Sequence, residues 1–146
     1  MQADERSKFA HTRILIVEDN QLNLMLLKDI LEFHGCTVIT TGLGATALDL
    51  ARQHHPDLIL MDIQLPDISG IDAARQLKED EETHAIPIIA VTAFAMPGDK
   101  SKILESGIDD YIAKPYRITE ILDIALQYLK RATGEYPTSG DAPGIL

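Results

Sequence analysis

The sequence is poor in the residues that cross-link a protein or anchor it in a membrane. It has one cysteine, Cys36, and no tryptophan. A single cysteine excludes an intramolecular disulfide, and nothing points to an oxidising compartment. No apolar run approaches the roughly 20 residues of a transmembrane helix. The first residues, MQADERSKFAHTR, lack the apolar core of a signal peptide. These absences predict a soluble, cytoplasmic protein without a membrane partner.

Positive charge is also scarce. Lysine and arginine number 13 against 23 acidic residues, which gives a formal net charge of −10. Sequence-independent nucleic-acid binding needs basic surfaces, so we expect no direct nucleic-acid partner. Hydrophobic residues make up 45% of the chain and charged residues 25%, as in ordinary globular proteins. The length of 146 residues suits one compact domain with a hydrophobic core.

Short apolar runs alternate with helical patterns along the chain. Five runs are typical of buried strands, at residues 13–17, 37–41, 58–61, 87–91 and 110–113. A predicted helix follows each run. After the first run, Leu22, Leu26, Ile30 and Phe33 recur at helical spacing, whereas the helix after the fourth run is short and contains Pro97 and Gly98. This alternation predicts an α/β fold, with a parallel sheet covered by helices on both faces and joined by right-handed crossovers.

The two ends of the chain have a different composition from its middle. Residues 1–12 are mostly polar, which predicts a flexible N-terminal arm. Residues 133–146 are dominated by Gly, Pro, Ser and Thr without apolar periodicity, which predicts a disordered tail. We therefore expect one domain at residues 13–132, with neither internal repeats nor an output domain.

Polar residues stand where four of the predicted strands end: Glu18, Asp19, Asp62, Thr92 and Lys114. The carboxyl ends of parallel strands share one edge of a sheet, so these residues can converge. Three crowded carboxylates favour either a raised pKa or a bound cation, and oxygen ligands with water suit Mg²⁺. A carboxylate beside a cation, a hydroxyl and an ammonium can attack an incoming phosphoryl group in line.

Taken singly, these residues have simpler explanations. Asp19 could cap the following helix, Thr92 could be a strand residue without a role, and Lys114 could be a surface lysine. The occurrence of the complete set at strand ends favours the functional interpretation.

The same stretches resemble the receiver domain of two-component response regulators. The similarity covers residues 13–132 through ILIVEDN, DLILMDIQLPDISG, PIIAVTA and DYIAKP. Within that family the chain is most similar to the stand-alone DivK-type single-domain regulators, through VEDNQLNL, MDIQLPDISG and VTAFAMPGD. The resemblance implies a flavodoxin-like (CheY-like) fold with strand order 2-1-3-4-5. It also implies a phosphorelay protein that is not a metabolic enzyme.

The resemblance further implies a role for each residue of the site. Asp62 accepts the phosphoryl group, and Mg²⁺ is bound by Asp19, Asp62, the backbone carbonyl of Gln64 and, through water, Glu18. Lys114 contacts the phosphoryl group, Thr92 bonds it after activation, and Tyr111 is the aromatic switch residue. The peptide bond between Lys114 and Pro115 is expected to be cis.

The partners implied are other signalling proteins. The phosphoryl donor is a sensor histidine kinase or a phosphotransfer protein. A downstream protein is expected to read the face formed by the fourth helix, fifth strand and fifth helix. The domain is expected to promote its own phosphorylation and dephosphorylation. The sequence leaves open whether it forms a homodimer.

Three other interpretations compete with a receiver. Residues 42–47 match the dinucleotide-binding pattern G-x-G-x-x-A, but they follow the second strand and leave Asp19, Thr92 and Lys114 unexplained. An aspartyl-phosphate hydrolase of the haloacid-dehalogenase kind would need an acid at the position of Gln64. A pure interaction module would not need the complete set of polar residues.

Overall fold

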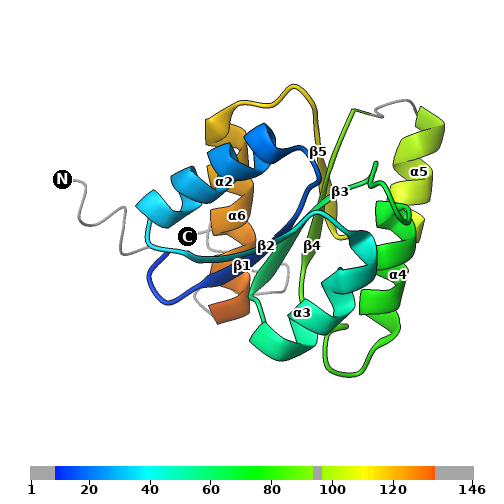
Figure 1. Cartoon of the computed structure of the whole chain (residues 1–146), viewed down its shortest axis with the longest axis horizontal. Coiled ribbons are helices and arrows are strands. Elements are labelled where there is room, and N and C mark those ends of the chain that lie inside the picture. The colour runs from blue at the N-terminus through cyan, green and yellow to red at the C-terminus, as the bar shows by residue number, and fades with distance from the viewer. Residues whose placement is uncertain (1–8, 94–96, 134–146) are drawn as a thin grey trace, which may run out of the picture.

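The computed structural model describes residues 9–93 and 97–133. Its centre is a parallel sheet with strand order β2-β1-β3-β4-β5, drawn in Figure 1. The strands are β1 (Arg13–Val17), β2 (Thr37–Thr41), β3 (Leu58–Asp62), β4 (Ile88–Thr92) and β5 (Asp110–Ala113). Strand order and parallel pairing confirm the predicted α/β, flavodoxin-like fold.

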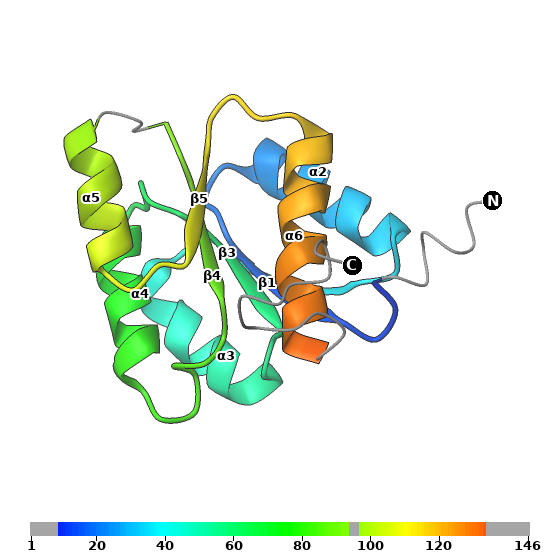
Figure 2. The same cartoon turned by 180° about the vertical axis from the view of Figure 1, so that it is seen from behind.

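Helices cover both faces of the sheet. They are α2 (Gln21–Phe33), the short 3₁₀ helix η1 (Gly44–Thr46), α3 (Ala47–His54), α4 (Gly70–Glu79), α5 (Pro97–Glu105) and α6 (Ile118–Thr133). Helices α2 and α6 lie on one face, and α3, α4 and α5 lie on the other, as Figure 1 and the reverse view in Figure 2 show. The predicted fourth and fifth helices are α5 and α6. Within the described residues, no helix combines the length and apolar character needed to cross a membrane.

Alternating side chains divide the core into two halves. Ile14 and Ile16 of β1 pack with α2 and α6, whereas Leu15 and Val17 pack with the helices of the other face. This two-residue alternation is the geometry of a pleated strand. All five residues of β3 are buried, which explains why its sequence is continuously apolar up to Asp62.

The buried face of α2 is not the one formed by the residues that indicated the helix in the sequence. Leu22, Leu26 and Phe33 are exposed, and Leu24, Leu27 and Leu31 face the core instead. This helix, QLNLMLLKDILEF, carries apolar residues on several sides, so spacing alone supports more than one stripe. The predicted helix is confirmed, but three of the residues that marked its spacing face solvent, so an apolar surface remains on the outer side of α2.

The segment before β1 is packed against the domain. Phe9 and Thr12, which we placed in the flexible arm, are both buried. The Phe9 ring lies 5.7 Å from that of His34, and the Thr12 hydroxyl donates to the Phe9 carbonyl. Burial of an aromatic ring outweighs the polar character of its neighbours. Residues 1–8 of the predicted arm and 134–146 of the predicted tail lie outside the described residues.

Candidate phosphoacceptor site

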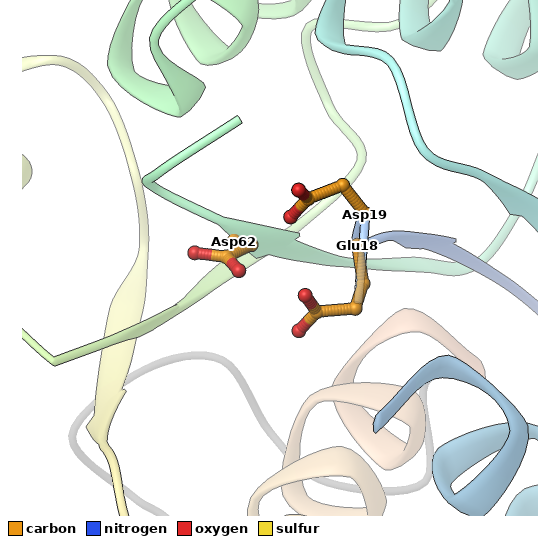
Figure 3. Close-up of side chains that lie close together, drawn as sticks. All are labelled: Glu18, Asp19 and Asp62. Atoms are coloured by element: carbon orange, nitrogen blue, oxygen red, sulfur yellow. The ribbon is translucent and has the colours of Figure 1, made fainter. Parts of the chain in front are cut away.

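Acidic residues meet at the carboxyl edge of the sheet. Glu18 and Asp19 directly follow β1, and Asp62 is the last residue of neighbouring β3. One carboxylate oxygen from each lies within 4.8 Å of the others. Figure 3 shows the three carboxylates facing a common space. Glu18 and Asp62 are only 3% and 6% exposed, whereas Asp19 lies at the surface.

The start of α2 explains why Asp19 can face this space. The N-cap of the helix is Asn20, whose side-chain oxygen accepts a 2.9 Å hydrogen bond from the Asn23 N–H. The Asn20 N–H in turn donates to Glu18 Oε2 over 3.1 Å. Asp19 is therefore not the helix cap, and the simpler explanation for this residue does not hold.

Lys114 joins the cluster from the other side of the sheet edge. Its Nζ lies 3.1 Å from Asp62 Oδ2 and 3.4 Å from Glu18 Oε1. The backbone positions it, because the Lys114 N–H donates to the Thr92 carbonyl over 2.8 Å. The Lys114–Pro115 peptide bond is cis, as the resemblance implies. Lys114 is thus a partly buried ammonium held between two carboxylates.

Asp62 is held at both of its oxygens. The Gln64 N–H donates to Asp62 Oδ1 over 2.9 Å, while Lys114 contacts Oδ2. These contacts fix the plane of the carboxylate at the end of β3.

After Asp62 the chain turns into α4, and Gly70 makes that turn feasible. A Cβ at Gly70 would lie 2.3 Å from the Asp62 carbonyl oxygen, so only glycine fits there.

The two predicted switch residues lie on adjacent strands. Thr92 is fully buried at the end of β4, where it is in register with Ala113. Tyr111 of β5 is half-buried and lines an open groove of about 750 Å³ between α5 and α6. Lys100 of α5 places its Nζ 5.5 Å from the centre of the Tyr111 ring. The ring therefore faces the α5–α6 side of the molecule in this structure.

Crowding of the carboxylates has an electrostatic consequence. The pKa of the Glu18 carboxyl is raised to about 7, because burial disfavours its charged form and the neighbouring Asp62 carboxylate adds to the effect. The Asn20 backbone N–H and Lys114 oppose this shift without cancelling it. The site thus brings three acidic side chains together with one ammonium, that of Lys114.

The donor set matches a hard divalent cation. Among the described residues, this is the group of three acids whose oxygens could surround an ion, and it contains neither histidine nor cysteine. Oxygen-only ligands suit Mg²⁺, whereas softer metals select nitrogen and sulfur ligands. A cation would also neutralise carboxylate charge.

The structure argues against the dinucleotide-binding alternative. In such a motif, backbone N–H groups of the glycine-rich turn must be available to the pyrophosphate. Here the Gly44 and Ala45 N–H groups donate to the Asp67 carboxylate over 2.9 and 2.8 Å. Gln64, at the position of the general acid of a haloacid-dehalogenase hydrolase, is an amide that holds Asp62 through its backbone.

Two residues near the site were not identified from the sequence. Asp67 bonds the loop at Gly44, and Tyr116 is half-buried in a groove that also includes Lys114. The burial of Tyr116 raises its pKa, and the Glu18 charge acts in the same direction. Tyr116 could have been suspected from its place two residues after Lys114. The Asp67 contact, in contrast, joins segments with no sequence signal for their proximity.

Comparison with known proteins agrees with this geometry. The family model described as the response regulator receiver domain matches residues 14–126 of the sequence. The chain is 52% identical over 116 residues to the polar-differentiation response regulator DivK of Brucella ovis, covering 80% of this chain and 94% of that protein. The DivK of Brucella anthropi is 50% identical over the same length.

Solved structures show the same fold. The receiver domain of a sensor histidine kinase from Pseudomonas aeruginosa, with a magnesium ion coordinated in its active-site cleft, matches with a TM-score of 0.75 and 37% identity over 86% of this chain and 99% of that one. A CheY-like receiver domain protein from Methanospirillum hungatei matches with a TM-score of 0.78 and 30% identity over 85% and 98%. On its sequence, its fold and its relatives, the chain belongs to the response regulator receiver domain family.

Proposed function

We propose that Asp62 accepts a phosphoryl group from the phosphohistidine of a sensor histidine kinase or phosphotransfer protein. The observation that carries this proposal is the buried Asp62 carboxylate, held by Lys114 and the Gln64 N–H beside two further acids. The proposal places the protein in the cytoplasm, where the ATP that charges histidine kinases is made.

The site provides the groups that phosphoryl transfer needs. A carboxylate oxygen of Asp62 attacks phosphorus while the bond from phosphorus to the donor imidazole breaks, and the imidazole leaves with its electron pair. Lys114 is already beside Asp62 and balances charge on the transferred oxygens. The Thr92 hydroxyl, at the end of the adjacent strand, is the second donor to these oxygens after transfer.

The acidic residues have a separate task. Asp19, Asp62 and the Gln64 carbonyl would hold Mg²⁺, with Glu18 acting through water. When bound, the ion neutralises negative charge on the phosphoryl group and on the carboxylates around it. The bound magnesium in the similar receiver from Pseudomonas aeruginosa supports this assignment.

The outer side of α2 is the surface that we assign to the phosphoryl donor. Leu22, Met25 and Leu26 are exposed there. Leu26 also lines a largely apolar groove of about 590 Å³ together with Lys114, Pro115 and other residues that lead into α6. A donor protein seated on this surface would have its histidine beside Asp62. An exposed apolar surface of this kind commonly marks a protein interface.

Phosphorylation is proposed to act on the α5–β5–α6 face. Tyr111 lines the groove on that face, and Thr92 is fully buried one strand away. A downstream protein is proposed to read this surface. We also propose that the domain promotes hydrolysis of its own phosphoaspartate, with the exposed residue Gln64, two positions after Asp62, at the solvent side of the site.

Incubation with acetyl phosphate and Mg²⁺, followed by intact-mass measurement, tests the proposal. We expect the wild type to gain one phosphoryl group and Asp62→Asn to gain none. Asp72→Asn is the matched control, because Asp72 is an exposed carboxylate on α4 that pairs with Arg75 over 3.5 Å. Phosphorylation of Asp62→Asn, or tight binding of a nicotinamide cofactor without any mass gain, would contradict the assignment.

A further inference from the structure

The glycine-rich segment of residues 42–46, called here the bridging segment, lies between two loops of the proposed metal site. The β1–α2 loop carries Asp19, and the β3–α4 loop carries Gln64. The bridging segment follows β2 and leads through η1 into α3, which packs beside α4, as can be followed in Figure 1. It has no part in the phosphoryl transfer described above.

On one side, the bridging segment touches the loop that carries Asp19. The Glu18 N–H donates to the Thr41 carbonyl over 2.9 Å, directly before the segment. A Cβ at Gly42 would lie 3.5 Å from the Asp19 Cα and 3.7 Å from the Glu18 carbonyl oxygen. A side chain at position 42 would therefore contact the backbone of the β1–α2 loop at the point where Asp19 enters the site.

On the other side, Asp67 fastens the β3–α4 loop to the segment. Its carboxylate accepts hydrogen bonds from both the Gly44 and Ala45 N–H groups. The loops approach so closely here that a Cβ at Gly44 would lie 2.8 Å from Ile68 Cγ1 and 3.1 Å from Leu65 Cδ1. The carboxylate and these apolar contacts together form one joint between the loops.

Both partners in this joint have limited freedom. In the bridging segment, the Thr41 and Thr46 hydroxyl oxygens lie 2.6 Å apart, and the Leu43 N–H donates to Thr41 Oγ1. The β3–α4 loop is closed at its ends, since the Gly70 N–H donates to the Ile63 carbonyl over 2.8 Å. Gln64 lies inside this closed loop. Movement at Asp67 would therefore be transmitted to the Gln64 backbone.

We propose that the bridging segment fixes the spacing between the loops that carry Asp19 and Gln64, and that Asp67 is a positioning residue for Mg²⁺. The inference rests on the proposed function, because it assumes that this site binds Mg²⁺. Charge-assisted hydrogen bonds are stronger than neutral ones, which suits a carboxylate to this role. The backbone N–H groups also lower the pKa of Asp67 and keep it ionised.

A purely structural role for Asp67 predicts a different result. If Asp67 only capped η1, its loss would lower the melting temperature of the metal-free protein and leave Mg²⁺ affinity unchanged. If it positions Gln64, Mg²⁺ affinity falls while the fold is kept. Asp67 is exposed and lies outside the hydrophobic core, so its replacement should not disturb the core.

Isothermal titration of the full chain with MgCl₂ at constant ionic strength distinguishes the two roles. For Asp67→Asn we expect the Mg²⁺ Kd to rise about tenfold. This is the size of effect seen for residues that orient the ligands of a metal without binding the metal themselves. The Mg²⁺ concentration for half-maximal phosphorylation by acetyl phosphate should rise in parallel, with the rate at saturating Mg²⁺ unchanged. Asp67→Glu, which keeps the carboxylate, should restore part of the affinity.

Two further variants separate charge from position. Asp72→Asn also removes a carboxylate, but from the exposed surface of α4, and should leave the Kd unchanged. Gly44→Ala crowds the same joint without changing charge and should raise the Kd as Asp67→Asn does. Wild-type Kd values in both Asp67→Asn and Gly44→Ala would overturn this inference but would not affect the proposed function. Absence of Mg²⁺ binding by the wild type would overturn the proposed function and this inference with it.

Discussion

Glu18 is the residue of the site whose charge depends most on the surroundings. Its pKa is raised from 4.5 to about 7, chiefly by burial. Below pH 4.5 the carboxyl is protonated in the folded and the unfolded chain alike. Between pH 4.5 and about 7 the unfolded chain releases this proton while the folded chain keeps it. The contribution of Glu18 to the free energy of unfolding therefore decreases as pH rises through this window and is lost above it.

This linkage predicts the behaviour of Glu18→Gln without metal. Glutamine resembles the protonated carboxyl, so the difference in melting temperature between the variant and the wild type should grow in the variant's favour from pH 4.5 to about 7 and then level off. Thermal melting in EDTA across this range measures it. Lys114 does not titrate in the window, because its contacts with Asp62 and Glu18 raise its pKa despite the opposing effect of burial. A difference that is constant with pH would show that Glu18 is ionised throughout.

At the residue scale, the sequence predicted which residues form the site better than it predicted the contacts between loops. Glu18, Asp62 and Lys114 could be identified because each follows or ends an apolar run, and strand ends share an edge of a parallel sheet. The joint between Asp67 and Gly44 has no comparable signal, since it depends on the packing of two loops. The G-x-G-x-x-A pattern suggested phosphate binding at a place where the N–H groups already have an acceptor within the chain.

At the scale of elements, α2 shows where periodicity fails. A helix with leucines on several sides can bury more than one stripe, and only contact with β1 and its neighbours selects Leu24, Leu27 and Leu31. The strands did not have this ambiguity, because β1 and β3 are buried on both faces. Their predicted and observed positions agree except that β3 extends to Asp62 and β4 is shifted by one residue, from 87–91 to Ile88–Thr92.

A matched pair of leucine variants tests the two faces of α2. Leu27→Ala, at a position 2% exposed, should lower the free energy of unfolding by about 3 kcal/mol. Leu22→Ala, at a position 76% exposed, should change it by less than about 0.5 kcal/mol. Urea denaturation measures both. Leu22→Ala should instead slow phosphoryl transfer from a phosphorylated donor protein while leaving transfer from acetyl phosphate unchanged. Equal slowing with both donors would place Leu22 outside the donor surface.

The segment before β1 makes a second prediction at this scale. Phe9 is 4% exposed and packs in the core cluster formed with α2 and α6. Phe9→Ala should therefore lower the free energy of unfolding by about 3 kcal/mol, as for other buried aromatic residues. Urea denaturation measures this loss, with Ala10→Gly as a control at an exposed neighbouring position. Wild-type stability of Phe9→Ala would mean that the segment is loose in solution, as its sequence suggested.

At the scale of the whole molecule, the site lies at the carboxyl ends of the strands, and the proposed output surface includes the last of these strands, β5. Asp62, Thr92 and Lys114 stand at the ends of β3, β4 and β5, and Tyr111 lies three residues before Lys114. The β4–β5 register places Tyr111 beside Ala90 and Thr92 beside Ala113. A change at Thr92 can thus reach Tyr111 without crossing the core. The alternation of elements predicted the parallel sheet, and the resemblance to receiver domains implied its strand order. The orientation of the Tyr111 ring was not predictable, because it is a property of one state of a switch.

That orientation leads to the last prediction. In this structure Tyr111 faces the α5–α6 groove and has Lys100 over its ring. If Thr92 moves toward the phosphoryl oxygens, it leaves space into which the ring can turn, and the contact with Lys100 is lost. Such a two-state element shifts when a new local charge favours one state. Tyr111→Ala should keep phosphorylation of Asp62 but weaken phosphorylation-dependent binding of the downstream protein. Thr92→Ala should do the same and also slow phosphorylation, since it removes a donor to the phosphoryl group.

Hydrogen exchange with and without beryllofluoride, which mimics the phosphoryl group, locates the change. We expect the largest differences between Ala93 and Tyr116, because this stretch includes α5, β5 and the loop at Lys114. Residues 94–96 of this stretch lie outside the described residues. The Tyr111→Ala protein should show a smaller response in α5 than the wild type, because the ring no longer couples β5 to that helix. Differences concentrated in α2 would instead mean that the donor and the downstream protein read the same surface, and the α5–β5–α6 assignment would be wrong.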